Sequence, residues 1–255
     1  MIFDFNNRNV LVVGAGRGIG QEIVRKFLLS KANVYAIDID EKLLSNISDN
    51  LQTKYLKNIT AIKCDVTDYN DVKKTVKQIS DKKRIEILVY CAGGTRSRIK
   101  TPIEKVSNND WKIIQDANVT GCFYFVRSVV PSMKKNKNGR IIVISSRAGI
   151  GVSLTGIQSY GTAKAAQIGF VKQLSSELGK YGITVNSVAP GFMPTSPDYI
   201  KQWKSYGKKR QLEILNAIAM KRIGKPEDIA NAVMFFSSEQ SGFITGQTLA
   251  VTGSP

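Results

Sequence analysis

Histidine is absent from this chain of 255 residues. Without an imidazole there is no Ser-His-Asp hydrolase, no His–Cys protease and no His-ligated metal site. The three cysteines, Cys64, Cys91 and Cys122, form no Cys-x-x-Cys pair and lie in apolar stretches, as small core residues do. No metal site is therefore predicted.

Long apolar runs are also missing, and none approaches the roughly 18 residues that a membrane-spanning helix needs. The amino terminus lacks the basic start and apolar middle of a secretory signal. Apolar residues make up 42% of the chain and charged residues 22%, which is ordinary for a soluble globular protein. The sequence therefore predicts a cytoplasmic protein with no membrane partner.

Acidic residues are few, because 20 Asp and Glu stand against 37 Lys and Arg, for a formal net charge of +17. Such a surplus raises the question of a nucleic-acid partner. The basic clusters, however, are scattered over expected helix ends and loops, without interleaved aromatic residues that would stack on bases. We expect lysine-rich solvated faces and no specific nucleic-acid partner.

Short apolar runs separated by helical patterns are present along the whole chain, as expected of buried parallel strands. They lie at residues 10–13, 33–38, 59–64, 85–90, 141–144, 184–189 and 246–251. This alternation predicts a three-layer, doubly wound Rossmann fold with a mainly seven-stranded parallel sheet and ligands at the carboxyl ends of the strands. We expect one domain over residues 1–255, with an insertion at about 192–218 that suits a lid over the substrate.

A glycine-rich turn follows the first expected strand. Gly14, Gly18 and Gly20 form G-x-x-x-G-x-G, and Ile19 occupies the last glycine position of the G-x-G-x-x-G pattern. Such a turn brings the backbone close to a pyrophosphate and places a helix N-terminus against the anion. It predicts a dinucleotide site, although glycine-rich turns after strands also occur without ligands.

The second expected strand ends in Asp38, 18 residues after Gly20. This is close to the spacing of about 20 for a carboxylate that accepts the ribose hydroxyls. A carboxylate there repels a 2′-phosphate, so NAD is favoured over NADP. Arg17 argues the other way because it can reach such a phosphate, and a simple turn ahead of a helix at Glu41 is the alternative role for Asp38.

The stretch from Arg140 to Lys164 carries the candidate chemistry. An apolar strand ends at Ser145 and Ser146, and Tyr160 and Lys164 then lie four residues apart, on one face of the next helix. A free tyrosine has a pKa near 10, and a nearby ammonium group moves that pKa down. With a serine to hold the substrate oxygen, the set suits proton exchange with an alcohol while hydride leaves the carbon.

Tyr-x-x-x-Lys is a weak signal by itself. A second copy, Tyr69 to Lys73, lies at the expected start of an exposed helix, with no strand-ending serine before it. A surface tyrosine over a solvated lysine is the simpler interpretation of such a pair. The pair at Tyr160 differs because the chain also carries a dinucleotide-type turn.

A long helical pattern runs from Trp111 to about Lys135 and contains Asn118 and Gly121. Both residues carry a propensity cost inside a helix. A local irregularity that exposes backbone groups is therefore expected there.

With these pieces in order, the chain resembles the short-chain dehydrogenase/reductase family in its single-domain form, over nearly its whole length. The resemblance rests on the glycine turn, on Cys91-Ala92-Gly93 after the fourth strand, on Pro190-Gly191 after the sixth, and on the set Asn118, Ser146, Tyr160 and Lys164. Two departures stand out: Cys91 replaces the family's usual asparagine, and Thr252-Gly253-Ser254 replaces a common Asp-Gly-Gly.

The resemblance implies a role for each member of the set. Tyr160 would exchange the proton with the substrate oxygen, and Ser146 would orient that oxygen. Lys164 would lower the tyrosine pKa and hold the nicotinamide ribose, and Asn118 would anchor a water linking Lys164 to solvent. Ser146 is preferred to Ser145 because Ser-Arg-Ala-Gly fits the family's Ser-x-x-Gly turn.

The resemblance also implies a cofactor site and a homotetramer. The cofactor residues are expected to be Gly14, Arg17, Gly18, Ile19, Gly20, Asp38, Asp65, Val66, Cys91, Ala92, Gly93, Tyr160, Lys164, Pro190, Gly191, Met193 and Thr195.

Substrate identity is expected to reside near residues 94–100, 147–157 and 192–218. Arg96, Arg98, Lys100 and Arg147 in these segments suggest an anionic substrate such as a 3-oxoacyl thioester of acyl carrier protein or coenzyme A, or a sugar acid. Ordinary solvated charges are the alternative. A sugar or polyol dehydrogenase and a non-catalytic dinucleotide-binding regulator are the other functions considered.

Overall fold

The computed structural model describes residues 3–49 and 53–254. Within that part, seven parallel strands form one sheet in the order β3-β2-β1-β4-β5-β6-β7. The strands are β1 (Asn9–Val13), β2 (Asn33–Asp38), β3 (Ile59–Lys63), β4 (Ile87–Tyr90), β5 (Gly139–Ile144), β6 (Ile183–Pro190) and β7 (Thr248–Val251). The strand order reverses between β1 and β4, and ligands of such sheets bind at that point.

The fold class expected from the sequence is confirmed, with small shifts at strand ends. β4 begins two residues after the expected position 85, and β7 begins at Thr248, not at 246. Glu86, just before β4, is buried and accepts a hydrogen bond from the Asn9 amide at 3.0 Å.

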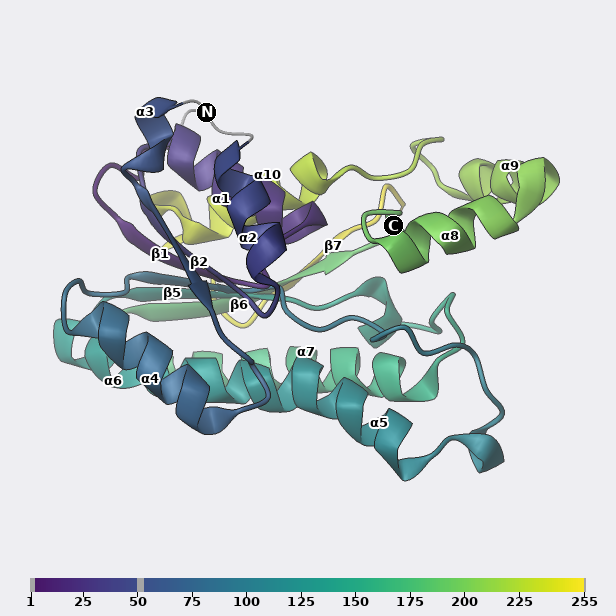
Figure 1. Cartoon of the computed structure of the whole chain (residues 1–255), viewed down its shortest axis with the longest axis horizontal. Helices are drawn as coiled ribbons and strands as arrows, with labels where there is room; N and C mark the ends of the chain where they lie inside the picture. Colours follow the sequence, from purple (N-terminus) through teal and green to yellow (C-terminus); the bar gives the residue numbers. More distant parts are fainter. Residues whose placement is uncertain (1–2, 50–52, 255) are drawn as a thin grey trace.

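Helices cover both faces of the sheet (Figure 1). On one face lie α1 (Gly18–Leu29), α2 (Glu41–Asp49) and α10 (Pro226–Ser237), and on the other lie α4 (Tyr69–Ser80), α5 (Asn108–Gln115), α6 (Gly121–Asn136) and α7 (Gln158–Leu178). The short α3 (Thr53–Leu56) precedes β3, while α8 (Pro197–Ser205) and α9 (Gly207–Ala217) project from one end of the molecule. Over the described residues, no helix combines the length and apolarity needed to cross a bilayer.

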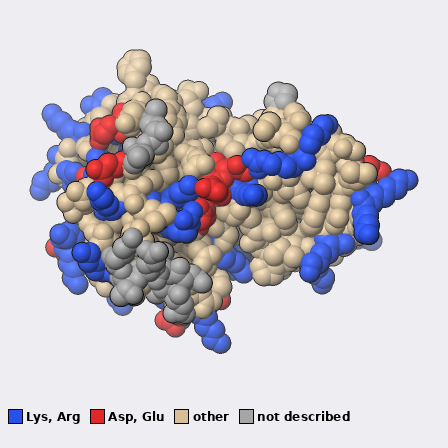
Figure 2. Space-filling view, turned by 90° about the horizontal axis from the view of Figure 1, so that it is seen from above, with Lys and Arg blue, Asp and Glu red and all other residues tan. Residues whose placement is uncertain are grey.

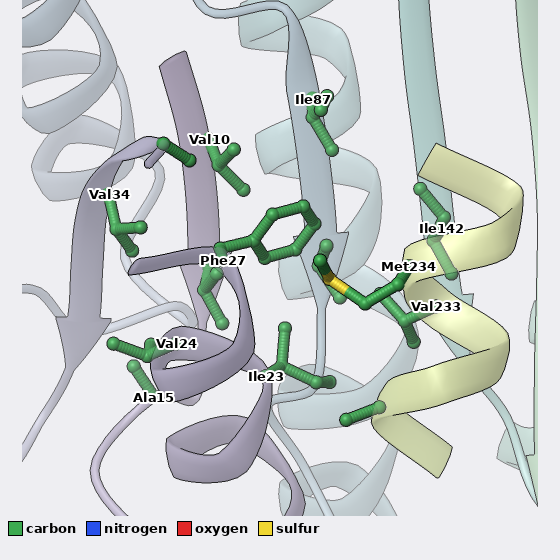
Figure 3. Packing of buried hydrophobic residues seen from close by; sticks show 14 of the residues in the cluster. Val10, Ala15, Ile23, Val24, Phe27, Val34, Ile87, Ile142, Val233 and Met234 are labelled. Atoms are coloured by element: carbon green, nitrogen blue, oxygen red, sulfur yellow. The ribbon is translucent and has the colours of Figure 1, made fainter. Parts of the chain in front are cut away.

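The central strands β1, β4, β5 and β6 are buried on both sides because each side faces a helical layer, whereas the edge strands β3 and β7 are partly exposed. Val10 and Val12 of β1 pack with Phe27 of α1, whereas the intervening Leu11 packs with Phe125 of α6. Figure 3 shows Phe27 and its neighbours on α1 beside Met234 of α10, over the strands. The two-sided burial explains why the strands are continuous apolar runs, not alternating patterns.

The second Tyr-x-x-x-Lys pair is structural. Asp68 caps α4 by accepting hydrogen bonds from the amides of Asn70 and Asp71, at 2.8 and 3.3 Å, so the helix begins at Tyr69 as expected. The ring of Tyr69 packs against Tyr124 and under the guanidinium of Arg127, which lies 4.0 Å from its centroid.

The irregularity expected near Asn118 is a π-helical turn, Asp116–Thr120, between α5 and α6. The amide of Gly121 donates to the carbonyl of Asp116, five residues back, and the buried hydroxyl of Tyr90 donates to the carbonyl of Ala117 at 2.7 Å. A Cβ on Gly121 would lie 2.5 Å from the Tyr90 hydroxyl, so glycine is required for this close approach. The end of β4 and the π-helical turn are thus fixed to each other.

Replacing Tyr90 with Phe tests this link. The substitution removes the hydroxyl and leaves the buried Ala117 carbonyl without that donor, so the free energy of unfolding should fall by about 1–3 kcal/mol. Urea denaturation followed by circular dichroism measures the change. Tyr35→Phe, at a half-buried tyrosine on β2, is the control. An unchanged midpoint for Tyr90→Phe would contradict the argument.

Candidate active site

The glycine turn brings the backbone of two strand ends together. Gly14 has a φ of +80°, and a Cβ there would lie 2.6 Å from the amide nitrogen of Ala92, in the turn after β4. A Cβ on Gly20 would lie 2.0 Å from the carbonyl oxygen of Gly14. Helix α1, all of whose residues are described, has no acidic residue in its first turn. The positive end of its dipole is therefore available to an anion.

Asp38 at the end of β2 takes part in this turn. Its carboxylate accepts hydrogen bonds from the amide of Gly16 at 2.9 Å and from that of Asp40 at 3.2 Å. The residue therefore braces the glycine loop and also shapes the turn before α2. Arg17 is exposed at the start of α1, in the wall of the same cleft.

Two adjoining cavities at the carboxyl edge of the sheet share five wall residues, which are Ile19, Cys91, Gly93, Ile144 and Thr195. The first is bounded by the glycine turn, Asp38, and Asp65 and Val66 after β3. The second is bounded by Ser146, Tyr160, Lys164 and the segment after β6 that begins at Pro190-Gly191. Every residue expected to contact a cofactor lies in the wall of one cavity or the other.

Tyr160 is at the start of α7, 7% exposed, in the wall of the second cavity. Its hydroxyl forms side-chain hydrogen bonds with Ser146 and with Tyr199 of α8. Ser145, the other candidate serine, is buried and bonded to Ser187, with 2.6 Å between the hydroxyl oxygens. The geometry therefore favours Ser146 over Ser145 as the partner of the tyrosine.

Burial raises the pKa of Tyr160, although its hydrogen bonds with Ser146 and Tyr199 act in the opposite direction. The expectation that Lys164 brings this pKa below its ordinary value is not met here. The ammonium nitrogen lies 5.8 Å from the ring centroid, and loss of solvation is the largest influence on the pKa of the phenol. Burial also lowers the pKa of Lys164, to about 8.

Lys164, 4% exposed, donates hydrogen bonds to the carbonyl of Ile144, at the end of β5, and to the side-chain oxygen of Gln167, both at 2.9 Å. The side-chain nitrogen of Gln167 donates to the carbonyl of Asn118 at 2.7 Å. The water that the family resemblance implies, anchored by Asn118 and linking Lys164 to solvent, stays a prediction. In the structure a glutamine amide joins Lys164 to the Asn118 carbonyl.

Asn118 is fully buried and lies behind the cavity walls, not in them. Its side chain pairs with both backbone groups of Gly94, at 3.0 Å each, and with the carbonyl of Ile114 at 2.8 Å. Gly93 has a φ of +130°, and a Cβ there would lie 2.2 Å from the Asn118 side-chain oxygen. Asn118 thus braces the turn after β4.

Cys91 stands where the family usually has asparagine. Burial raises the pKa of its thiol to about 12, so it is a neutral group in the wall between the two cavities.

The basic residues expected to meet an anionic substrate are differently placed. Arg98 is bonded to Asp110 at 2.7 Å, and Arg96 lies in the wall of the first cavity. Of the four, all within the described part of the chain, Arg147 alone lines the cavity with Tyr160. Figure 2 shows one face of the molecule, over which lysine and arginine side chains are spread with acidic ones among them.

Two residues of the site were missed by sequence reasoning. Gln167 lies three positions after Lys164, so the helical period placed it on the same face, and this signal was available. Tyr199 lies in the insertion, where no periodic pattern relates its position to the sheet. Its contact with Tyr160 had no signal in the sequence.

Comparison with known proteins identifies the family of the chain. A family model described as enoyl-(acyl carrier protein) reductase matches residues 14–253. Among curated relatives, 3-oxoacyl-(acyl-carrier-protein) reductase FabG of Buchnera aphidicola is 38% identical over 96% of both chains. Subunit BbsD of (2S)-((R)-hydroxy(phenyl)methyl)succinyl-CoA dehydrogenase from Thauera aromatica is 35% identical over 97% of this chain and 96% of its own.

Solved structures agree as well. A 3-oxoacyl-(acyl-carrier protein) reductase with bound NAD from Brucella melitensis has a TM-score of 0.87 and 30% identity, covering 98% of this chain and 92% of that one. A short-chain type dehydrogenase/reductase from Mycobacterium ulcerans has a TM-score of 0.90 and 27% identity, with 98% and 90% covered. The chain belongs to the short-chain dehydrogenase/reductase family. It is an oxidoreductase that acts on CH–OH groups with NAD or NADP.

Proposed function

We propose that this enzyme reduces a 3-oxoacyl thioester to the 3-hydroxyacyl thioester, with Tyr160 as the proton donor. The observation that carries the proposal is the hydroxyl of Tyr160, hydrogen-bonded to Ser146 in a cavity that adjoins a dinucleotide-type cleft. The cleft residues fit a dinucleotide, because the glycine turn offers bare backbone and a helix N-terminus. Hydride goes to the carbonyl carbon and the phenol proton goes to its oxygen.

Each side chain of the set has one task in this mechanism. A bound nicotinamide cofactor supplies the hydride. Ser146 donates a hydrogen bond to the carbonyl oxygen and holds it near the phenol, which releases its proton as negative charge develops there. Lys164 uses two of its three protons on Ile144 and Gln167, which leaves the third for a ribose hydroxyl.

The raised pKa of Tyr160 favours the reductive direction. Burial keeps the phenol protonated at neutral pH, and a protonated phenol is the form that reduction consumes. Alcohol oxidation instead needs the phenolate, which this environment disfavours. The enzyme is therefore proposed to act as a reductase at neutral pH.

NAD is the proposed cofactor, because the Asp38 carboxylate lies in the wall of the first cavity. Arg17, in the same wall, is the argument for NADP. Family neighbours include both kinds, since the Brucella reductase holds NAD, and a solved ElxO, 28% identical with a TM-score of 0.87, holds NADP.

The walls of the second cavity suit an acyl thioester. Val152, Leu154, Phe192 and Met193 offer apolar surface to an acyl chain, and the exposed Arg147 offers a cation to a phosphate-bearing carrier. Two relatives carry acyl-carrier or CoA substrates in their names. A sugar or polyol substrate is the second candidate, favoured by the hydroxyls of Ser153 and Thr155 in the same wall.

Helices α8 and α9 are proposed as the lid of a single catalytic domain. Phe192 at the base of this insertion packs against Trp203 and Tyr206, with ring centroids 5.7 and 6.3 Å away. Tyr199 extends from α8 to Tyr160. A homotetramer and a cytoplasmic location stay predictions of the sequence.

Replacing Tyr160 with Phe tests the proton transfer. Turnover of acetoacetyl-CoA, followed by the absorbance of NADH, should fall by about 10²–10⁴-fold because the proton donor is lost. The affinity for NADH, measured by fluorescence titration, should be little changed. Tyr69→Phe, in the structural Tyr-x-x-x-Lys pair, should keep full activity. A dinucleotide-binding regulator would show no turnover in any of these proteins.

Replacing Asp38 with Asn tests cofactor choice while keeping an oxygen that can accept from the Gly16 amide. Removing the charge relieves the repulsion of a 2′-phosphate, so the ratio of the NADPH to NADH dissociation constants should fall by about tenfold. Isothermal titration gives both constants. Equal affinities of the unaltered enzyme for NADH and NADPH would refute the preference for NAD.

Replacing Arg147 with Ala tests the anionic substrate. The KM for acetoacetyl-CoA should rise by about 5–30-fold, as the loss of a charge-assisted contact predicts, whereas the KM for a neutral N-acetylcysteamine thioester should stay the same. Lys172→Ala, at an exposed lysine in the second half of α7, is the matched control. An equal rise for both thioesters would mean that Arg147 does not read charge.

A further inference from the structure

Gln167 is a buried amide that belongs to no role assigned so far. It is 1% exposed, one turn after Lys164 on α7. Its oxygen accepts from the Lys164 ammonium at 2.9 Å, and its nitrogen donates to the Asn118 carbonyl at 2.7 Å. We infer that Gln167 is a positioning residue for the catalytic lysine, which it joins to the Asn118 carbonyl. The inference rests on the proposed function.

The bond pattern allows one orientation of the amide. With the group turned over, its NH₂ would face an ammonium and its oxygen would face a carbonyl, and both contacts would be repulsive. The Gln167 side chain is nearly inaccessible to solvent, so its amide has no water as an alternative partner. The pairing therefore fixes the ammonium in one place at the end of β5.

The other end of the network is the π-helical turn, Asp116–Thr120. Two successive carbonyls of this turn receive side-chain donors from elsewhere in the fold: Ala117 from Tyr90 of β4, and Asn118 from Gln167 of α7. A π-helical turn shifts its carbonyls out of the regular helical pairing. Gln167 uses one of these carbonyls to tie Lys164 to the part of the chain that braces the turn after β4.

An amide in this position also changes how protons move. Water accepts one proton while releasing another, whereas a primary amide accepts only at its oxygen and donates only from its nitrogen. Gln167 therefore holds the ammonium without giving it a path to solvent through Asn118. The hydroxyls beside Tyr160 on the substrate side are those of Ser146 and Tyr199.

The titratable groups that influence Lys164 are uncharged at neutral pH. The charge of Lys164 is therefore stabilised by neutral hydrogen-bond acceptors. Cys91 after β4 and Cys122 of α6 are the titratable groups that influence it, and burial raises the pKa of each thiol to about 12. Tyr160, whose pKa burial also raises, is protonated and uncharged at neutral pH. The Ile144 carbonyl and the Gln167 oxygen therefore stabilise the charged form of Lys164, which predominates below a pH of about 8.

The direct test is the titration of Lys164 by NMR, on protein with ε-¹³C-lysine and no cofactor or substrate. The Lys164 signal is identified by its loss in Lys164→Arg. Removing the acceptor in Gln167→Leu should lower the pKa of Lys164 from about 8 by one unit or more, because only the ammonium form uses that bond. Gln167→Glu should raise it, because a carboxylate favours the charge.

Gln173→Leu, at an exposed glutamine on the same helix, should leave the titration unchanged. The inference would be overturned if Lys164 had the same pKa in the unaltered protein and in the Gln167→Leu, Gln167→Glu and Gln173→Leu variants. If Gln167→Leu fails to fold, the Glu variant decides alone, by a raised or unchanged pKa. Since no turnover is involved, this result stands whether or not Tyr160→Phe abolishes catalysis.

A kinetic readout separates positioning from mere support of the fold. In Gln167→Leu the alkaline limb of the kcat profile for acetoacetyl-CoA reduction should move to lower pH by the shift that NMR records, and the Kd for NADH should rise. In Gln167→Glu the limb should move to higher pH with activity retained. A lower Tm in both variants with neither limb displaced would mean that Gln167 only supports packing.

Discussion

The site depends on one buried cation held by neutral oxygens. Lys164 has no carboxylate in its hydrogen-bond set, and its ammonium is fixed by the Ile144 carbonyl and the Gln167 amide. Burying such a group costs several kcal/mol unless hydrogen bonds compensate. The end of β5, the face of α7 and the π-helical turn must therefore all be in register for the lysine to stay charged. The fold brings the end of β5 and the face of α7 to the ammonium nitrogen of Lys164, and Gln167 joins this nitrogen to the π-helical turn.

The same burial sets the chemistry of Tyr160. Loss of solvation opposes the charged form of both residues, so it raises the pKa of the phenol and lowers that of the ammonium. Tyr160 is thus held as a protonated phenol, not as a phenolate. The mechanism proposed above, proton donation to a carbonyl oxygen, follows from this sign.

The strand pattern, the glycine turn and the approximate place of Ser146, Tyr160 and Lys164 follow from the sequence, because apolar periodicity and chain order determine them. The sign of the Tyr160 pKa does not follow, since it depends on how much water three packed elements exclude. The sequence also did not reveal the hydrogen bond from the Gln167 side chain to the Asn118 carbonyl. The spacing of three residues predicts that Gln167 lies beside Lys164 on one helix face. Its bond to the Asn118 carbonyl cannot be predicted, because it depends on the π-helical turn lying against α7. Asp38 is a turn residue, as its alternative role predicts, and it also lies in the wall of the cleft, whereas its contact with a ribose stays a prediction.

The contact between Tyr199 and Tyr160 makes the acidity of the Tyr160 phenol depend on where α8 lies. This hydrogen bond acts to lower the pKa of Tyr160. With α8 acting as the proposed lid, an outward movement of this helix would break the bond, and the phenol would then hold its proton more tightly. The phenol would then be a weaker acid under an open lid than under a closed one, which would couple proton release to enclosure of the substrate.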